Sequence, residues 1–393
     1  MFENIEAKAP DAILKLIAEF AADEREQKVD LGVGVYRDGN GRTPIFAAVK
    51  KAEQYLVREQ DSKAYFGSAG SSAFCEAIEK LTFGDAAGAE RICTLQSPGG
   101  SGALRVAAGL LLAARADAAV WTSEPTWSNH VPLLGGAGVR LKSYPYYDVD
   151  SNSIRFEEML AALRKAPAGD VVLLHGCCHN PTGMDLSVEQ WHDVAGVIEE
   201  RGLLPFVDIA YQGFASGVDE DAYPVRMLFD RVPEMIVANS CSKNFGLYRD
   251  RVGSLSLVTS DGATSTAVRS QATSIVRTMY SMPPDHGAAV VTHILNDAGL
   301  HDLWQTELDG MRARLREMRG LLVAELAAAV TDRDFSHIER GSGMFSYLGV
   351  TPEQALRMKE EFAVYVVETG RINVCGITPD NVSYIAASAA AVL

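Results

Sequence analysis

VVLLHGCCHNPTGMDLSVEQWHDVAGVIEERGLLPFVD, residues 171–208, has the pattern of two buried strands with a helix between them. Val171–His175 is a mostly apolar run of strand length, as is typical of a strand covered on both faces. Ser187 and Gln190 have the spacing of a capping box, which predicts that a helix begins there. Leu203–Val207 predicts the next strand. The stretch therefore indicates a crossover unit of a parallel sheet.

The same alternation of strand-length apolar runs and amphipathic helices extends from about Gly99 to Val258. It predicts an α/β fold with a mostly parallel sheet flanked by helices. After Leu300, apolar residues recur at steps of three and four, which predicts a long helix that could connect two domains. These apolar positions are Met311, Leu315, Met318, Leu322 and Leu326.

The C-terminal part has a different texture. From about Phe335, short strands and a helix around residues 355–367 predict a smaller α+β domain. No Pro- or Ser-rich linker divides the chain, so we expect the domains to be closely packed. We expect residues 44–310 to form a large domain, and residues 1–43 to join residues 311–393 in the small one.

Composition excludes several classes of protein. The 393 residues carry a formal net charge of -15 and no basic run, which argues against nucleic-acid binding. The six cysteines lack paired spacing, so we expect neither disulfides nor a metal site, and a reducing cytoplasm. The longest apolar stretch, near Leu110–Ala114, is too short to span a membrane. The N-terminus lacks a signal-peptide core and predicts a helix entered at Pro10-Asp11.

Polar side chains follow three of the predicted strands. Asn180 follows the first strand, Asp208 and Tyr211 follow the second, and Lys243 follows a third near residues 235–238. Singly, these residues could be a turn, a helix cap, a core aromatic and a solvated cation. Ligands of open α/β sheets bind beyond the carboxyl ends of the strands. Together, the four side chains therefore predict one site.

A glycine-rich segment could add an anion-binding group to this site. Ser97–Gly102 reads SPGGSG, and residues 103–115 favour a helix directly after it. Glycines allow close backbone approach, and a helix N-terminus presents free amides, so the segment could hold a phosphate. The signal is weak alone, because such a turn is often only a loop and the P-loop pattern is absent.

Over nearly its whole length the sequence resembles the fold-type I, pyridoxal-phosphate-dependent aminotransferases, in the subgroup that acts on aspartate and aromatic amino acids. The resemblance rests on motifs in the same order and at similar spacing. These are LGVGVYRD at Leu31, GGSGALR at Gly99, PTWSNH at Pro125, HNPTG at His179, DIAYQGF at Asp208, SCSKNFGLYRDRVG at Ser240, YSMPPDHGA at Tyr280 and GRINVCG at Gly370.

The resemblance implies pyridoxal 5'-phosphate as the cofactor, attached to Lys243 as a Schiff base. The same lysine would then move the proton of the reaction. Asp208 would keep the pyridine nitrogen protonated, so that the ring takes up electrons. Tyr211 and Asn180 would hydrogen-bond the phenolic oxygen, and Trp127 would stack on the ring. Trp127 and Asn180 would also contact the substrate.

The resemblance also implies how phosphate and substrate are held. Arg371 would bind the α-carboxylate, and Arg277 of the other subunit would bind a side-chain carboxylate. Gly34 belongs to a segment expected to close over the substrate, and His130 would stand behind Asp208. We therefore expect a homodimer with shared sites. The expected phosphate contacts are Gly100, Ser101, Ser240, Ser242, Arg251 and, from the partner subunit, the residue that matches Tyr65.

The choice of amino donor rests on fewer positions. Ser101, Ala64 and Met282 resemble the aromatic subgroup, because aspartate enzymes usually carry larger or more polar residues there. The positions that resemble the aspartate subgroup instead are Val35, Arg37 and Thr43. We expect transfer from tyrosine and phenylalanine to 2-oxoglutarate, with appreciable activity on aspartate. The alternative within the subgroup is an aspartate aminotransferase with little aromatic activity.

Two other classes of function could use the same cofactor-binding residues. A lyase or decarboxylase could use the same cofactor, but the presence of both Arg277 and Arg371 disfavours it. A non-catalytic regulator that senses pyridoxal phosphate would need a DNA-binding module. The segment before Leu31 leaves no room for one, and the net charge is unsuitable.

Overall fold

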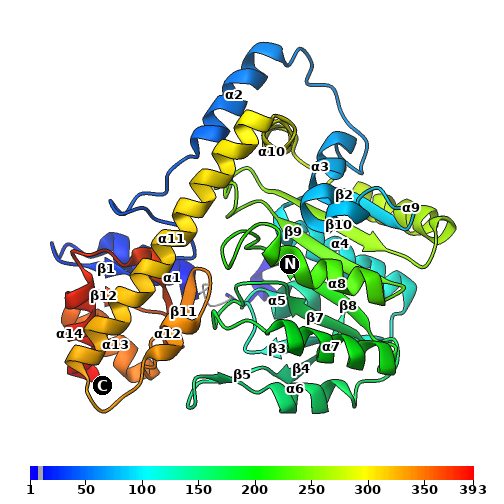
Figure 1. Ribbon diagram of the computed structural model, residues 1–393. Coiled ribbons are helices and arrows are strands. Elements are labelled where there is room, and N and C mark those ends of the chain that lie inside the picture. Colours follow the sequence, from blue (N-terminus) through cyan, green and yellow to red (C-terminus); the bar gives the residue numbers. More distant parts are fainter. Residues whose placement is uncertain (8–11) are drawn as a thin grey trace.

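The computed structural model describes residues 1–7 and 12–393. Figure 1 shows a larger lobe built on a central sheet and a smaller lobe that contains the C-terminus. The long helix α11 (Ala298–Ala329) passes from beside α10 (His286–Asn296) into the smaller lobe. This confirms the long helix expected from the apolar periodicity. The predicted helix entry at Pro10-Asp11 lies outside the described residues, and α1 is described over Ala12–Ala22.

A seven-stranded sheet forms the centre of the larger lobe. β10 pairs antiparallel with β2 and with β9, and the other four neighbouring pairs are parallel, so the sheet is mostly parallel, as predicted. In spatial order the strands are β2 (Ile92–Pro98), β10 (Val252–Val258), β9 (Met235–Ser240), β8 (Leu204–Ile209), β7 (Val171–His175), β3 (Ala119–Glu124) and β4 (Arg140–Pro145). A separate two-stranded ladder consists of β5 (Tyr147–Asp148) and β6 (Ser153–Ile154).

Helices cover both faces of this sheet, because alternate side chains of a strand point to opposite faces. In β7, Val172 and Leu174 belong to one apolar cluster, whereas Val171 and Leu173 belong to another that includes α4. Apolar cores on both faces of the sheet confirm the predicted α/β fold, with a sheet flanked by helices. The helices between β2 and α10 are α4 (Gly99–Ala114), α5 (His130–Gly135), α6 (Phe156–Leu163), α7 (Val188–Arg201), α8 (Tyr223–Arg231) and α9 (Gly262–Met279). Before β2 come α3 (Ser72–Phe83) and α2 (Ala47–Glu59), which packs on α10 and α11.

The crossover unit β7–α7–β8 is present as predicted. The amide of Gln190 donates to Ser187 Oγ at 3.2 Å, and the amide of Ser187 donates to Gln190 Oε1 at 2.9 Å. Both halves of the capping box are therefore formed, which satisfies two backbone donors at the start of α7. Gly202 ends the helix in the left-handed conformation at φ 61.

The glycine-rich segment differs from the expectation. We expected a turn over Ser97–Gly102 and a helix from residue 103, but α4 begins at Gly99. Gly99 has φ +70, which turns the chain sharply as it leaves β2, and Gly100 and Ser101 are already helical. The glycines thus form the first turn of the helix and place its free amides directly beside the sheet edge.

The smaller lobe contains segments from both the N-terminal and the C-terminal part of the chain. β1 (Val29–Asp30) pairs in parallel with β12 (Val364–Tyr365), and β11 (Phe345–Tyr347) pairs with β13 (Arg371–Asn373). The helix expected around residues 355–367 is α13 (Pro352–Phe362), because Ala363 adopts a left-handed φ of 52 and ends it before β12. The smaller lobe also contains α12 (Ser336–Arg340), α14 (Val382–Val392) and η4 (Val374–Gly376). In the larger lobe, η2 (Gly84–Ala86) adjoins α3 and η3 (Glu220–Ala222) adjoins α8. The first described element is η1 (Phe2–Asn4).

None of the helices in the described part of the chain combines the length and apolar character needed to cross a bilayer.

Candidate active site

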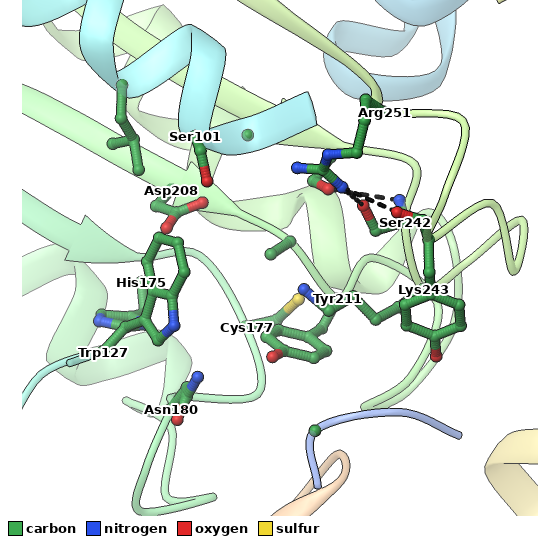
Figure 2. A pocket seen from close by; sticks show the side chains of 16 residues that line it. Ser101, Trp127, His175, Cys177, Asn180, Asp208, Tyr211, Ser242, Lys243 and Arg251 are labelled. Carbon is green, nitrogen blue, oxygen red and sulfur yellow. Dashed lines mark hydrogen bonds between the residues drawn. The ribbon is translucent and has the colours of Figure 1, made fainter. Parts of the chain in front are cut away.

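A cavity of about 230 Å³ opens beyond the carboxyl ends of β7, β8 and β9, beside the first turn of α4. In Figure 2, Asp208 and Trp127 lie on one side of it and Lys243, Ser242 and Arg251 on the other. The structure thus brings together most of the predicted site residues. Those that line the cavity are Gly34, Gly100, Ser101, Trp127, Asn180, Asp208, Tyr211, Ser240, Ser242, Lys243 and Arg251.

Asp208 is the buried carboxylate of the cavity and stands near the end of β8. His130 Nε2 lies 2.9 Å from Asp208 Oδ2, and His130 Nδ1 lies 2.8 Å from Thr126 Oγ1. Burial alone would raise the pKa of Asp208, but the hydrogen bond and charge of His130, with smaller contributions from His175 and Lys243, bring it below its ordinary value. Asp208 is therefore ionised near neutral pH, and His130 Nε2 is the hydrogen-bond donor.

Lys243 follows β9 and is only partly exposed. Burial lowers the pKa of its amine from 10.5 to about 8; the charge of Asp208 opposes this shift and that of Arg251 adds to it. The amine lies 4.8 Å from the centre of the Tyr211 ring. Burial also raises the pKa of Tyr211, so its hydroxyl keeps its proton. About a tenth of the Lys243 amine is therefore neutral and nucleophilic at pH 7.

The opposite end of the cavity is suited to an anion. Arg251 Nη1 donates to Ser242 Oγ at 3.2 Å, and a Cβ on Gly99 would lie 2.4 Å from Arg251 Nη2. A Cβ on Gly100 would lie 3.3 Å from Ser240 Cβ. Glycine at both positions therefore lets the α4 N-terminus approach the guanidinium and the two hydroxyls closely. Backbone amides, hydroxyls and a guanidinium together form a typical phosphate-binding set.

Three predicted site residues do not line this cavity. Arg371 is buried on β13, where its Nη2 donates to the carbonyl of Gly32 at 2.7 Å. Arg277, on α9, is exposed and donates to Ser281 of its own chain. Tyr65 is 92% exposed. Tyr65 and Arg277 therefore do not reach the cavity of their own chain, whereas Arg371 lies near enough to Tyr211 for its charge to oppose the rise in the pKa of that phenol.

Several cavity residues were not predicted. His175 is the last residue of β7, and burial lowers its pKa to about 3, so it is neutral. Tyr248 lines the cavity and its hydroxyl accepts a hydrogen bond from the amide of Tyr36 at 2.9 Å. The other lining residues that were not predicted are Leu104, Cys177 and Ala210. The position of His175 at a strand end, and of Tyr248 within the same motif as Lys243, could have indicated them.

Comparison with known proteins agrees with this geometry. The family Aminotransferase class I and II matches residues 26–388. The chain belongs to the class I and II aminotransferases. It is 47% identical over 396 residues to the aspartate aminotransferase of Escherichia coli (strain K12), and the match covers 100% of both chains. It is 43% identical to the aromatic-amino-acid aminotransferase of Paracoccus denitrificans, covering 98% of each.

Solved structures of other aminotransferases share the whole fold. The crystal structure of the aromatic-amino-acid aminotransferase from Burkholderia pseudomallei, covalently bound to pyridoxal phosphate, matches with a TM-score of 0.97 and 43% identity. The match covers 100% of this chain and 99% of the other. The predicted fold class and the predicted aminotransferase family are thus both confirmed.

Proposed function

We propose that this aminotransferase uses pyridoxal phosphate to transfer the amino group of tyrosine and phenylalanine to 2-oxoglutarate, with additional activity on aspartate. The observation that carries the cofactor assignment is that three groups converge on one cavity. They are the Lys243 amine, the Asp208 carboxylate and the phosphate-binding set at Arg251, here called the cradle at Arg251, which consists of Gly100, Ser101, Ser240, Ser242 and Arg251. The covalent pyridoxal phosphate in the Burkholderia pseudomallei aminotransferase supports the same assignment.

The residues of the cavity fit this cofactor. Asp208 Oδ1 is buried and accepts no hydrogen bond from any described residue, so it is available to a protonated ring nitrogen. The phosphate would be held by Gly100, Ser101 and Arg251, with the hydroxyls of Ser240 and Ser242. Asn180 and Tyr211 would donate to the phenolic oxygen, and Trp127 would cover the ring.

Bound pyridoxal phosphate supplies an aldehyde that receives the amino group and a ring that takes up electrons. Lys243 provides the amine that holds the aldehyde, and its pKa of about 8 suits it to take up and return a proton near neutral pH. Asp208 stays ionised and His130 fixes its orientation, so the negative charge remains directed at the ring nitrogen. Tyr211 keeps its proton and can donate it to an oxygen anion.

Loss of the lysine tests the cofactor assignment. We expect Lys243→Ala to abolish transamination while the protein still binds pyridoxal phosphate non-covalently. Borohydride reduction followed by mass spectrometry should attach the cofactor to Lys243 in the unaltered protein and to no residue in the variant. Near-normal turnover in Lys243→Ala would refute the assignment.

Two of the expected site residues, Tyr65 and Arg277, indicate a homodimer. Tyr65 and Arg277 lie outside the cavity of their own chain, and both are exposed. We propose that they complete the site of a partner subunit, where Arg277 binds a side-chain carboxylate and Tyr65 the phosphate. Arg371 and Gly34 would serve the substrate of their own subunit. Both Arg277 and Arg371 would then pair with a dicarboxylate such as 2-oxoglutarate.

Hybrid dimers test this sharing directly. Arg277→Ala and Lys243→Ala impair different groups of each site, so a mixed dimer should contain one site with neither defect. Mixing the two inactive variants should therefore restore activity toward dicarboxylate substrates. Equal amounts of each variant measured alone provide the control. Mixed dimers that remain inactive would contradict the shared site.

Donor specificity depends on the side chains around the substrate. The relatives bear both names, since an aromatic-amino-acid aminotransferase of Pseudomonas aeruginosa is 46% identical and the Escherichia coli aspartate enzyme 47%. Ser101 lines the cavity, and its small side chain favours the aromatic assignment. Catalytic efficiencies for tyrosine, phenylalanine and aspartate with 2-oxoglutarate should be comparable. An aspartate efficiency several orders of magnitude above the others would favour the alternative, an aspartate aminotransferase.

The chain divides into a large and a small domain. We propose that residues 1–43 and 311–393 form the small domain around β1 and β12, and that residues 44–310 form the large one. The boundary at residue 310 falls inside α11, which would make this helix the rigid connection.

We also propose a cytoplasmic location. The six cysteines are all free, and thiols stay reduced in the cytoplasm.

A further inference from the structure

Phe345 lies among three groups of the proposed site, although it does not line the cavity. Its ring centre is 4.5 Å from Arg371 Cζ and 6.0 Å from the Tyr211 ring, which it meets edge-on at 86°. A Cβ on Gly34 would lie 3.3 Å from Phe345 Cζ. One buried ring therefore touches the expected carboxylate-binding arginine, the expected cofactor-binding phenol and the segment expected to cover the substrate.

The pairing of β11 with β13 sets this contact. Tyr347 stands opposite Arg371 in the antiparallel register, and Phe345 is two residues before Tyr347. Side chains two residues apart on a strand share a face, so Phe345 and Arg371 are diagonal neighbours. The guanidinium over the ring gains a cation–π attraction, which favours this position of the arginine side chain.

Arg319 holds the segment that leads into β11, residues 341–345. It projects from α11 and is 1% exposed. Its guanidinium donates to the carbonyls of Ile338 and Phe345, to that of Ser342 at 2.9 Å and to that of Gly343 at 3.1 Å. No carboxylate of the described residues forms an ion pair with it. A buried cation that binds only carbonyls fixes the backbone and contributes little as an ion pair.

The other side of this segment rests on the loop that carries Asn180. The amide of Ser342 donates to the carbonyl of Gly183 at 2.7 Å, and a Cβ on Gly183 would lie 2.1 Å from the Phe345 carbonyl. Ser342 Oγ also donates to Asp185. Residues 341–345 are therefore held between Arg319 and the HNPTG loop by hydrogen bonds on both sides, which restrict the movement of residues 341–345.

We propose that Arg319 and Phe345 are positioning residues for the substrate carboxylate: Arg319 fixes residues 341–345, and Phe345 holds the guanidinium of Arg371 in place to receive the carboxylate. This inference rests on the proposed function of Arg371. It predicts a loss of affinity shared by all carboxylate ligands, whatever their side chain, because Phe345 supports only the group that these ligands have in common.

The test uses the holoenzyme and two non-reacting carboxylates, succinate and 3-phenylpropanoate, with affinities measured by calorimetry. Phe345→Leu should weaken both by a similar factor, about tenfold from the loss of a desolvated cation–π contact. Arg319→Met should do the same, and Arg319→Lys should be intermediate, since one ammonium cannot reach all the carbonyls. In steady state, these variants should raise KM for every donor more than they lower kcat.

Phe335→Leu is the matched control, because Phe335 and Phe345 are both 2% exposed and Phe335 is not in contact with Arg371. It should cost similar stability in thermal unfolding but leave both affinities unchanged. Unaltered affinities in Phe345→Leu, or weakening of only one of the two ligands, would refute the positioning role. An unaltered holoenzyme that fails to transaminate would instead refute the proposed function itself.

Discussion

The amine of Lys243 should be far more reactive at neutral pH than that of an ordinary lysine. Its burial lowers the pKa from 10.5 to about 8, and a group is neutral only above its pKa. At pH 7 the neutral fraction should therefore be about 300-fold larger than for a lysine at 10.5. Below pH 8 the fraction falls about tenfold for each further pH unit.

Competitive labelling of the cofactor-free protein with acetic anhydride measures this directly. The reagent acylates neutral amines, and mass spectrometry gives the rate at Lys243 relative to a free lysine derivative in the same tube. The rate should rise with pH and reach half its plateau near pH 8. Asp208→Asn removes a charge that favours the protonated amine, so the midpoint should move lower. A midpoint near 10.5, or an upward shift in Asp208→Asn, would refute this account of Lys243.

Three further predictions concern the cofactor site and the scaffold. His130→Ala should raise the pKa of Asp208 and weaken pyridoxal phosphate binding at least tenfold in a fluorescence titration, as about 1.5–3 kcal/mol for a charged hydrogen bond requires; equal affinity would contradict this. Gly99→Ala strains a φ of +70 and displaces Arg251, so it should weaken binding of pyridoxal phosphate but not of pyridoxal. Gln190→Ala should lower the free energy of unfolding in urea by about 1 kcal/mol without loss of activity.

The sequence predicts well which residues meet at the carboxyl ends of the parallel strands, because the apolar pattern and the topology of the sheet agree there. Apolar runs locate the strands, and topology places Asn180, Asp208 and Lys243 together, since parallel strands end at one edge. The prediction of where α4 starts failed for a physical reason. Glycine disfavours a helix interior, yet at Gly99 it lets the chain turn sharply and the helix begin at once. Helix propensity alone cannot register that tertiary requirement.

Residues that act through tertiary contacts leave little signal in the sequence. Phe345 stands in an apolar run like any core aromatic, and its contact with Arg371 depends on a strand register that the sequence does not state. Arg319 is one of four arginines on α11, and it is the only one of them that is fully buried. His175 ends a predicted strand and could have been predicted as a site residue, but its pairing with Asp208 depends on the register of β7 against β8.

Anion binding should couple the two ends of the cavity. The charge of Arg251 lowers the pKa of Lys243. The N-terminus of α4 adds positive potential to the same end of the cavity, although the whole chain has a net charge of -15. A phosphate bound at Arg251 would offset that charge, so the protonated form of Lys243 becomes more stable and its pKa rises. Labelling in inorganic phosphate should therefore give a higher midpoint than in chloride at equal ionic strength. Arg251→Gln should start at a higher midpoint and respond less to phosphate. A midpoint that phosphate leaves unchanged or lowers would show that the cradle at Arg251 does not bind the anion.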